Sequence, residues 1–243
     1  MLLVMKIIFR GLVFGVLFCA FLSLFSCATR INGALAADGG AALSVSMALE
    51  PGITAVIRRS LAAAGGQAGN VLDGAAIAQS MSNAPGIALV SLRNTTPAAV
   101  EGQVRIYAIG EFLAAADGRG FINFEQGSSG GRCVINIDRS NGPEILELLS
   151  PQIVDLVNAL MAPLATGEVM SKGEYLELVA SFYNNTAISN EIADSRIRAS
   201  IEFPGTVTSV RGGTFSGRTA NLDIPLIDLL VLETPFICIV TWN

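Results

Sequence analysis

Alternating apolar and polar residues predict several short β-strands along this chain. In segment 42–50 (ALSVSMALE), Leu43, Val45 and Met47 fall on one side, which is the pattern of a strand with one buried face. Comparable strand-like runs follow at 87–92, 100–113, 120–125, 133–138, 196–210, 214–224 and 236–242. Turn-forming sequences such as NTTP, ADGRG and RGGT separate several of these runs, so we expect sequential strands to pair antiparallel.

Helical spacing of apolar residues predicts helices between these groups of strands. Segments 53–64 and 71–81 have this spacing, and a short apolar helix is expected at 225–232. Three further helix starts carry capping signals, at Asn141-Gly142-Pro143-Glu144, Ser150-Pro151 and Ser171-Lys172-Gly173-Glu174. The order of the elements predicts a single α+β domain over 42–243, with an antiparallel sheet and helices packed on one face.

The first 26 residues have the pattern of a secretory signal peptide. Lys6 and Arg10 precede a continuous apolar run, 11–25, and a positive start followed by about 7–15 apolar residues is typical of such leaders. A membrane-spanning helix would require about 20 apolar residues with anchors on both sides. We therefore expect residues 1–26 to be removed.

The end of this leader resembles the lipobox of bacterial lipoproteins. Leu24-Phe25-Ser26-Cys27 matches its order of an aliphatic, a variable and a small residue before cysteine. The resemblance implies that the Cys27 thiol receives a diacylglycerol and that cleavage frees the Cys27 amine for a third acyl chain, such as palmitate. Two or three buried acyl chains hold firmly, since each methylene contributes about 0.8 kcal/mol. The alternative is an ordinary signal peptide cut after Ala34-Leu35-Ala36, with Cys27 discarded.

Composition narrows the function classes. Small and polar residues after the leader predict a flexible tether over 27–41. Charged residues are 14% of the chain, against about 25% in ordinary domains, so the domain is expected to bury much apolar surface, line an apolar cavity or associate. The net charge of −5 becomes about −7 without Lys6 and Arg10. An acidic surface argues against nucleic acid as a partner and against electrostatic attachment to anionic lipid.

The absence of histidine disfavours an enzyme. Without histidine, the chain has neither Ser-His nor Cys-His nucleophilic pairs, nor the usual zinc ligand sets. We expect no metal and no cofactor. Cys133 and Cys238 lie in strand-like segments, where they could form a disulfide in an oxidising compartment or stay buried as free thiols.

One predicted helix carries an aromatic side. Tyr175, Phe182 and Tyr183 follow helical spacing after the capping box at Ser171. Aromatic residues with an apolar body and a polar tip suit the wall of a ligand groove, and an aromatic stripe of this kind can equally be core. Both alternatives stay open from the sequence.

The segment Phe203–Leu232 (FPGTVTSVRGGTFSGRTANLDIPLIDLLVL) resembles the LppM-like lipoprotein domain. The shared features are a strand ending near Pro-Gly, a glycine-turned hairpin and a second strand, with a tryptophan in the final segment, here Trp242. The resemblance implies a surface or periplasmic lipoprotein that contacts lipid or glycolipid through an apolar pocket. No binding residue is carried over from it.

Two functions follow from these observations. The first is a lipid-anchored, non-enzymatic module of the bacterial envelope, on the periplasmic side or the cell surface, that binds an apolar or amphiphilic ligand in a cavity of about 300 Å³ or more. The second is a structural or assembly lipoprotein that presents an exposed apolar patch to an envelope protein. In both cases the membrane would be a partner, through the anchor. The other partner would be the apolar ligand in the first case and the envelope protein in the second.

Overall fold

Two β-sheets and a group of helices make up the fold. The computed structural model describes residues 28–63, 69–82, 86–109, 121–127, 129–146 and 151–243. The larger sheet has, in spatial order, β3 (Ile87–Thr96), β4 (Ala99–Ile106), β2 (Ala41–Ala48), β1 (Ala28–Leu35), β7 (Arg196–Glu202), β10 (Thr219–Pro225) and β9 (Thr214–Ser216). The smaller sheet has β5 (Ile122–Gly127), β6 (Gly130–Ile137), β11 (Phe236–Trp242) and β8 (Val207–Arg211).

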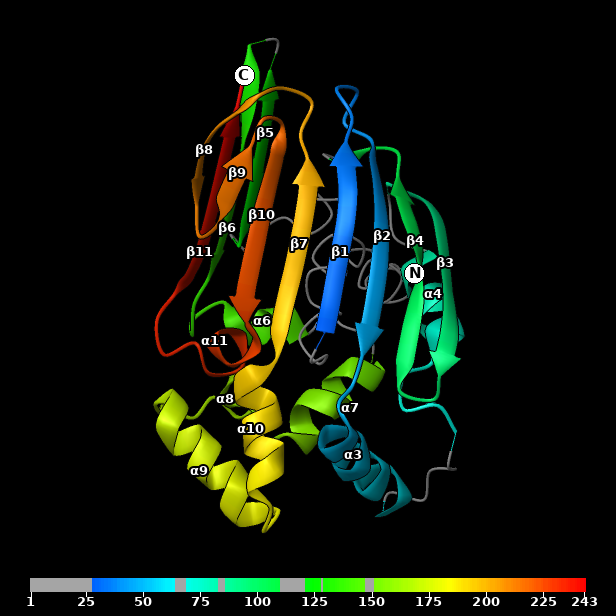
Figure 1. Cartoon of the computed structure of the whole chain (residues 1–243), viewed down its shortest axis with the longest axis vertical. Coiled ribbons are helices and arrows are strands. Elements are labelled where there is room, and N and C mark those ends of the chain that lie inside the picture. Colours follow the sequence, from blue (N-terminus) through cyan, green and yellow to red (C-terminus); the bar gives the residue numbers. More distant parts are fainter. Residues whose placement is uncertain (1–27, 64–68, 83–85, 110–120, 128, 147–150) are drawn as a thin grey trace, which may run out of the picture.

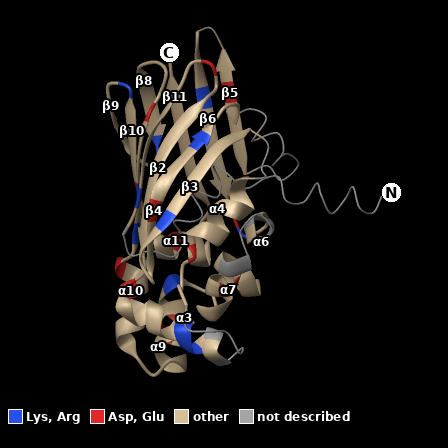
Figure 2. Cartoon of the chain, turned by 90° about the vertical axis from the view of Figure 1, so that its right-hand side faces the viewer, with Lys and Arg blue, Asp and Glu red and all other residues tan. Residues whose placement is uncertain are grey.

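Most of the helices lie at one end of the two sheets, in the lower part of Figure 1 and, after a quarter turn, of Figure 2. The exception is α4, which packs beside β3. The helices are α3 (Pro51–Ala63), α4 (Gly74–Ser82), α6 (Gly142–Leu146), α7 (Pro151–Ala159), α8 (Pro163–Thr166), α9 (Lys172–Phe182), α10 (Thr186–Asp194) and α11 (Leu226–Val231). The predicted α+β class with mostly antiparallel pairing is confirmed. The arrangement differs in having two sheets, with the helices at their end rather than on one face.

Local patterns explain several elements. In β2 the residues Leu43, Val45 and Met47 are buried and the serines between them are exposed, as the alternation predicts. The α9 helix begins with the predicted capping box, in which the Ser171 side chain accepts from the Glu174 N–H and the Glu174 side chain accepts from the Ser171 N–H. These elements form where the sequence carries a complete local signal.

The predicted tether over 27–41 is wrong. Residues 28–35 form β1, which lies inside the larger sheet, antiparallel to β2 and parallel to β7. Its sequence, ATRINGAL, has too few apolar residues to signal a strand. The strand is held by backbone hydrogen bonds to two neighbours, which a small or polar side chain does not prevent. Residues 1–27, with Cys27, and Ser150 lie outside the described residues.

The predicted hairpin at RGGT is also wrong. Strand β8 pairs with β11 in the smaller sheet, whereas β9 pairs with β10 in the larger one. Gly212 and Gly213 therefore carry the chain from one sheet to the other. Gly212 has φ +84°, and a Cβ on Gly213 would lie 2.4 Å from the Asn221 carbonyl oxygen, so this corner requires glycine. None of the helices in the described ranges is long and apolar enough to cross a membrane.

Candidate functional site

An apolar cavity of about 130 Å³ lies between the two sheets. Every side chain that lines it is a hydrocarbon or a thiol. The lining residues are Ile31, Leu35, Ala41, Leu43, Ile109, Ile122, Phe124, Cys133, Ile135, Ala199, Ile201, Phe203, Leu222, Cys238 and Val240. The cavity can therefore offer apolar contact and little hydrogen bonding from side chains.

Strand alternation brings these residues to one place. Ile31 on β1, Leu43 on β2 and Ala199 on β7 all belong to the face that is turned inward, toward the smaller sheet, and they come from three neighbouring strands. The smaller sheet supplies the opposite wall, from β5, β6 and β11. Ala41 and Ala199 have short side chains, which leaves space that Leu or Ile would fill.

The cavity interrupts the hydrophobic core. The main cluster of buried residues includes Ala41 and Leu43, and a second cluster contains Phe203, Val240 and Trp242. Lining residues Leu35, Phe124 and others are only half-buried. This part of the cavity wall therefore lies close to the protein surface.

Aromatic rings form one end of the cavity. The Trp242 ring lies 4.8 Å from the ring of Phe203 and 5.7 Å from the ring of Phe124, measured between centroids. Trp242 is the sole tryptophan of the chain and is buried. A ligand that enters the cavity would contact Phe203 or Phe124 and thereby come close to Trp242.

Cys133 and Cys238 face the cavity as free thiols. Cys133 is paired with Val240 and Cys238 with Ile135, so the two cysteines are diagonal neighbours on β6 and β11. Diagonal Cα atoms lie about 7–8 Å apart, beyond the usual 4.4–6.8 Å of a disulfide. The register thus favours the free-thiol alternative over a disulfide.

Burial weakens the acidity of both thiols. It raises the pKa of Cys133 to about 12, with a smaller contribution from the nearby Cys238, and the pKa of Cys238 to about 11. Both are therefore neutral near pH 7 and unsuited to nucleophilic work or metal binding, which require the thiolate. Within the described residues, no group of three or more Cys, Asp or Glu side chains is arranged to hold a metal ion.

The three aromatic residues Tyr175, Phe182 and Tyr183, for which the sequence left a ligand groove and the core as alternatives, do not share one environment. Tyr175 is fully buried, and its hydroxyl donates to the Leu160 carbonyl oxygen at 3.0 Å. The Tyr183 hydroxyl donates to the Ala159 carbonyl oxygen. Phe182 is 64% exposed and meets Tyr183 edge-on. Leu178 on the same helix is also exposed.

The two tyrosines serve the end of α7. The last carbonyl groups of a helix have no partner within the helix, and the Tyr175 and Tyr183 hydroxyls satisfy two carbonyls there. Burial raises the pKa of the Tyr175 phenol far above its usual range. Tyr175 therefore belongs to the core, which is one of the two alternatives that the sequence left open. The sequence did not predict which residues line the inter-sheet cavity, because most of the lining residues come from seven strands that only the tertiary structure brings together.

Comparisons with known proteins give little further information. No family model matches the sequence, and no curated protein matches it. Among solved structures, the folded domain of the LppM protein of Mycobacterium tuberculosis aligns with 88% of this chain and 88% of that chain, at 11% sequence identity and a TM-score of 0.39. At this TM-score and identity we draw no conclusion about ligand or activity from it.

Proposed function

We propose that this chain is a lipid-anchored, non-enzymatic protein of the bacterial cell envelope whose inter-sheet cavity receives the end of an apolar chain. The observation that carries the proposal is a cavity lined wholly by hydrocarbon and thiol side chains. Ligand sites are concave and mostly apolar. An aqueous cavity would need polar partners for its waters, which this lining does not supply.

The volume limits the size of the ligand group. At about 130 Å³ the cavity is smaller than the 300 Å³ expected from the sequence and below the range of drug-sized sites, about 300–1,000 Å³. It is close to the roughly 150 Å³ of an apolar cavity that stays dry and binds benzene. The proposal is therefore for the terminal carbons of an acyl chain or a ring of similar size, with the rest of the ligand outside.

The anchor proposal rests on the sequence around Cys27. Since β1 begins at Ala28, an acylated Cys27 would join the bilayer to a central strand without an intervening tether. The domain would then lie directly at the membrane surface. Intact mass spectrometry of the membrane-extracted protein tests this, because acylation adds the mass of two or three acyl chains to a product beginning at Cys27. An unmodified product beginning beyond Cys27 would refute it.

Trp242 provides the test of the cavity. A dodecanoic acid brominated at its terminal carbon should quench Trp242 fluorescence, because bromine quenches on contact and the ring lies beside Phe203 and Phe124. Unbrominated dodecanoic acid should compete without quenching. Titration gives the dissociation constant.

Two adjacent alanines supply a matched pair of variants. Ala41 lines the cavity, whereas Ala42 is exposed on the opposite face of β2. Ala41→Leu adds three carbons to the cavity and should weaken binding of the brominated acid at least about tenfold, which corresponds to 1.4 kcal/mol. Ala42→Leu should leave its affinity unchanged. Equal affinities for both variants, or quenching that saturates in neither, would contradict cavity binding.

The alternative assembly function has less support. Large apolar side chains exposed in the described part of the chain lie on separate elements, such as Leu89 on β3, Phe215 on β9 and Val169 before α9. Leu178 and Phe182 are one turn apart on α9 and form the most compact pair. Two residues make a small contact for a stable protein interface, which typically buries about 800 Å² per partner.

A further inference from the structure

An unbroken row of uncharged polar side chains crosses the outer face of the larger sheet. Directly opposed pairs on neighbouring strands connect all seven strands. In spatial order the row is Ser91, Gln103, Ser44, Asn32, Ser200, Asn221 and Thr214. Each of these side chains can both donate and accept hydrogen bonds. Six strand spacings of about 4.8 Å give the row a length of about 29 Å.

Longer, charged side chains border this row. Two residues further along six of these strands, the sheet carries Arg93, Glu101, Ser46, Arg30, Arg198 and Asp223, all charged except Ser46. The short serine side chains beside long arginines leave the face hollowed. Two hollows, of about 460 and 540 Å³, lie along it and share Arg30 and Asn32. We call the two hollows together the sheet trough.

Arg30 lies at the centre of the sheet trough without an ion pair in the described part of the chain. Arg93 pairs with Glu101, and the Arg198 Nε lies 3.8 Å from an oxygen of Asp223. Arg30 lies directly opposite Arg198 on the neighbouring strand. Like charges directly opposite each other destabilise a sheet. An anion between the two guanidinium groups would remove this repulsion.

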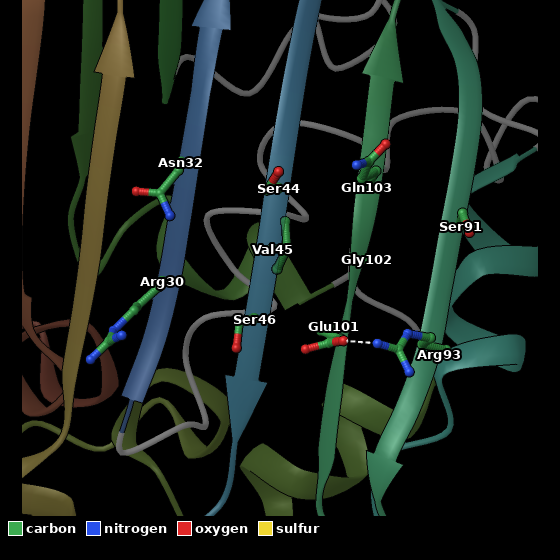
Figure 3. Close-up of a pocket in the computed structure, with 10 residues that line it drawn as sticks. All are labelled: Arg30, Asn32, Ser44, Val45, Ser46, Ser91, Arg93, Glu101, Gly102 and Gln103. Atoms are coloured by element: carbon green, nitrogen blue, oxygen red, sulfur yellow. Dashed lines mark hydrogen bonds and ion pairs between the residues drawn. The ribbon is translucent and has the colours of Figure 1, made fainter.

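Figure 3 shows how the central side chains lie. Arg30 and Asn32 extend from β1 toward the neighbouring strand on the side of β7, and Glu101 and Arg93 meet on the other side of the hollow. Ser44, Ser46 and Gln103 lie between them on β2 and β4. Arg30 and Asn32 therefore point toward the hollow on the β7 side, which Arg198, Ser200 and Asn221 also line.

We propose that the sheet trough binds an acidic polysaccharide that carries carboxylate groups. A carboxylate would lie between Arg30 and Arg198, since guanidinium groups bind carboxylates through paired hydrogen bonds. The hydroxyl groups of neighbouring sugars would exchange hydrogen bonds with the neutral row on either side. The trough faces away from the apolar cavity, so this proposal is independent of the cavity and of the anchor.

A bilayer fits the sheet trough less well. The trough is hollowed, and its three arginines are opposed by two carboxylates, Glu101 and Asp223. Electrostatic attachment to anionic lipid typically uses clusters of about 4–8 basic residues. A single surplus positive charge within a hydrogen-bonding trough suits a ligand that is mostly hydroxyl with occasional negative charge.

Titration calorimetry of the full chain in detergent, with hexagalacturonate as the probe, tests the proposal. Arg30→Gln should weaken binding about 10- to 100-fold, as expected for losing a hydrogen-bonded charge contact. Its thermal unfolding midpoint should stay the same or rise, because the substitution removes the repulsion from Arg198. Arg58→Gln, on the exposed side of α3, is the matched control and should change the affinity less than about twofold, since it lies outside the trough.

Three further probes separate the alternatives. Maltohexaose offers hydroxyls without charge and inorganic phosphate offers charge without hydroxyls, so each should bind more weakly than hexagalacturonate. Equal binding of either, or an equal effect of Arg30→Gln and Arg58→Gln, would overturn the proposal. The third probe is a pair of vesicles, one anionic and one zwitterionic. The proposal would also be overturned if hexagalacturonate fails to bind and Arg30→Gln lowers the partition of the protein into anionic vesicles relative to zwitterionic ones. The trough would then be a membrane contact.

Discussion

Removing the Tyr175 hydroxyl tests the structural role assigned to this residue. In Tyr175→Phe the ring keeps its packing in the core, and only the hydrogen bond to the Leu160 carbonyl is lost. Tyr175 has no exposed surface, so water cannot replace the missing donor. We expect lower stability and no change in ligand binding.

The magnitude follows from what the carbonyl loses. A typical hydrogen bond contributes a net 0.5–1.5 kcal/mol, and a buried group left unsatisfied costs about 1–3 kcal/mol. We therefore expect the free energy of unfolding to fall by about 1–3 kcal/mol. For a domain of this size, each kcal/mol corresponds to about 2–4 °C in the melting temperature.

Tyr183→Phe is the matched control for this measurement. The Tyr183 hydroxyl also donates to a carbonyl of the α7 end, but Tyr183 is only half-buried. Water can replace its hydrogen bond, so the loss should stay below about 1 kcal/mol. Urea denaturation followed by circular dichroism measures both variants.

A particular result would refute this reasoning. If Tyr175→Phe unfolds at the same urea concentration as the parent but binds the brominated probe at least tenfold more weakly, Tyr175 acts in ligand binding. The groove alternative from the sequence would then be right. A larger loss for Tyr183→Phe than for Tyr175→Phe would instead contradict the link between burial and cost.

Two other predictions concern contacts that hold the fold. The Glu191 carboxylate on α10 accepts hydrogen bonds at 2.9 and 3.0 Å from backbone N–H groups of the first turn of α3. Glu191→Ala should therefore lower the free energy of unfolding, measured by urea denaturation, by about 1.5–3 kcal/mol. Glu191→Gln should recover part of that loss. Burial raises the pKa of Cys133 from 9.0 to about 12 and that of Cys238 to about 11. The folded state holds these protons more tightly than the unfolded state. The contribution of the two thiols to the free energy of unfolding should therefore be fully present below about pH 9 and fall as the pH rises toward 11. Between about pH 8 and pH 10, the free energy of unfolding of the double variant Cys133→Ala/Cys238→Ala should fall less than that of the parent protein. Urea denaturation at these two pH values measures the difference. An equal fall in the variant and the parent would show that the thiols are not the cause.

Local signals predicted the elements that depend on near neighbours in the chain. The capping box at Ser171 and the alternation in β2 each occupy a few consecutive residues, so their physical cause is present in the sequence itself. The inward residues Ile53, Val56 and Ile57 of α3 follow from helical spacing and are buried. Helix α10 was not predicted; it begins after Asn185, whose side chain accepts a hydrogen bond from the Ala187 N–H.

The candidate sites depend on register between distant segments. Whether Cys133 lies opposite Cys238 or diagonal to it is decided by a one- or two-residue choice of pairing between β6 and β11, which no local pattern encodes. The sheet trough likewise requires seven strands in one register. Separate strand predictions could not bring Arg30 beside Arg198.

The sequence by itself determined the absence of histidine and the alternating segments that form strands of an α+β domain. The acylation of Cys27 stays a prediction from the sequence. Only the tertiary structure decided the role of β1, whose small and polar residues show no strand pattern and which is held between β2 and β7. It also decided that Tyr175 is core and that the cavity lies between the sheets. The physical reason is that backbone hydrogen bonding and packing between distant strands depend on which segments meet, and a local pattern of side chains carries no information about that choice.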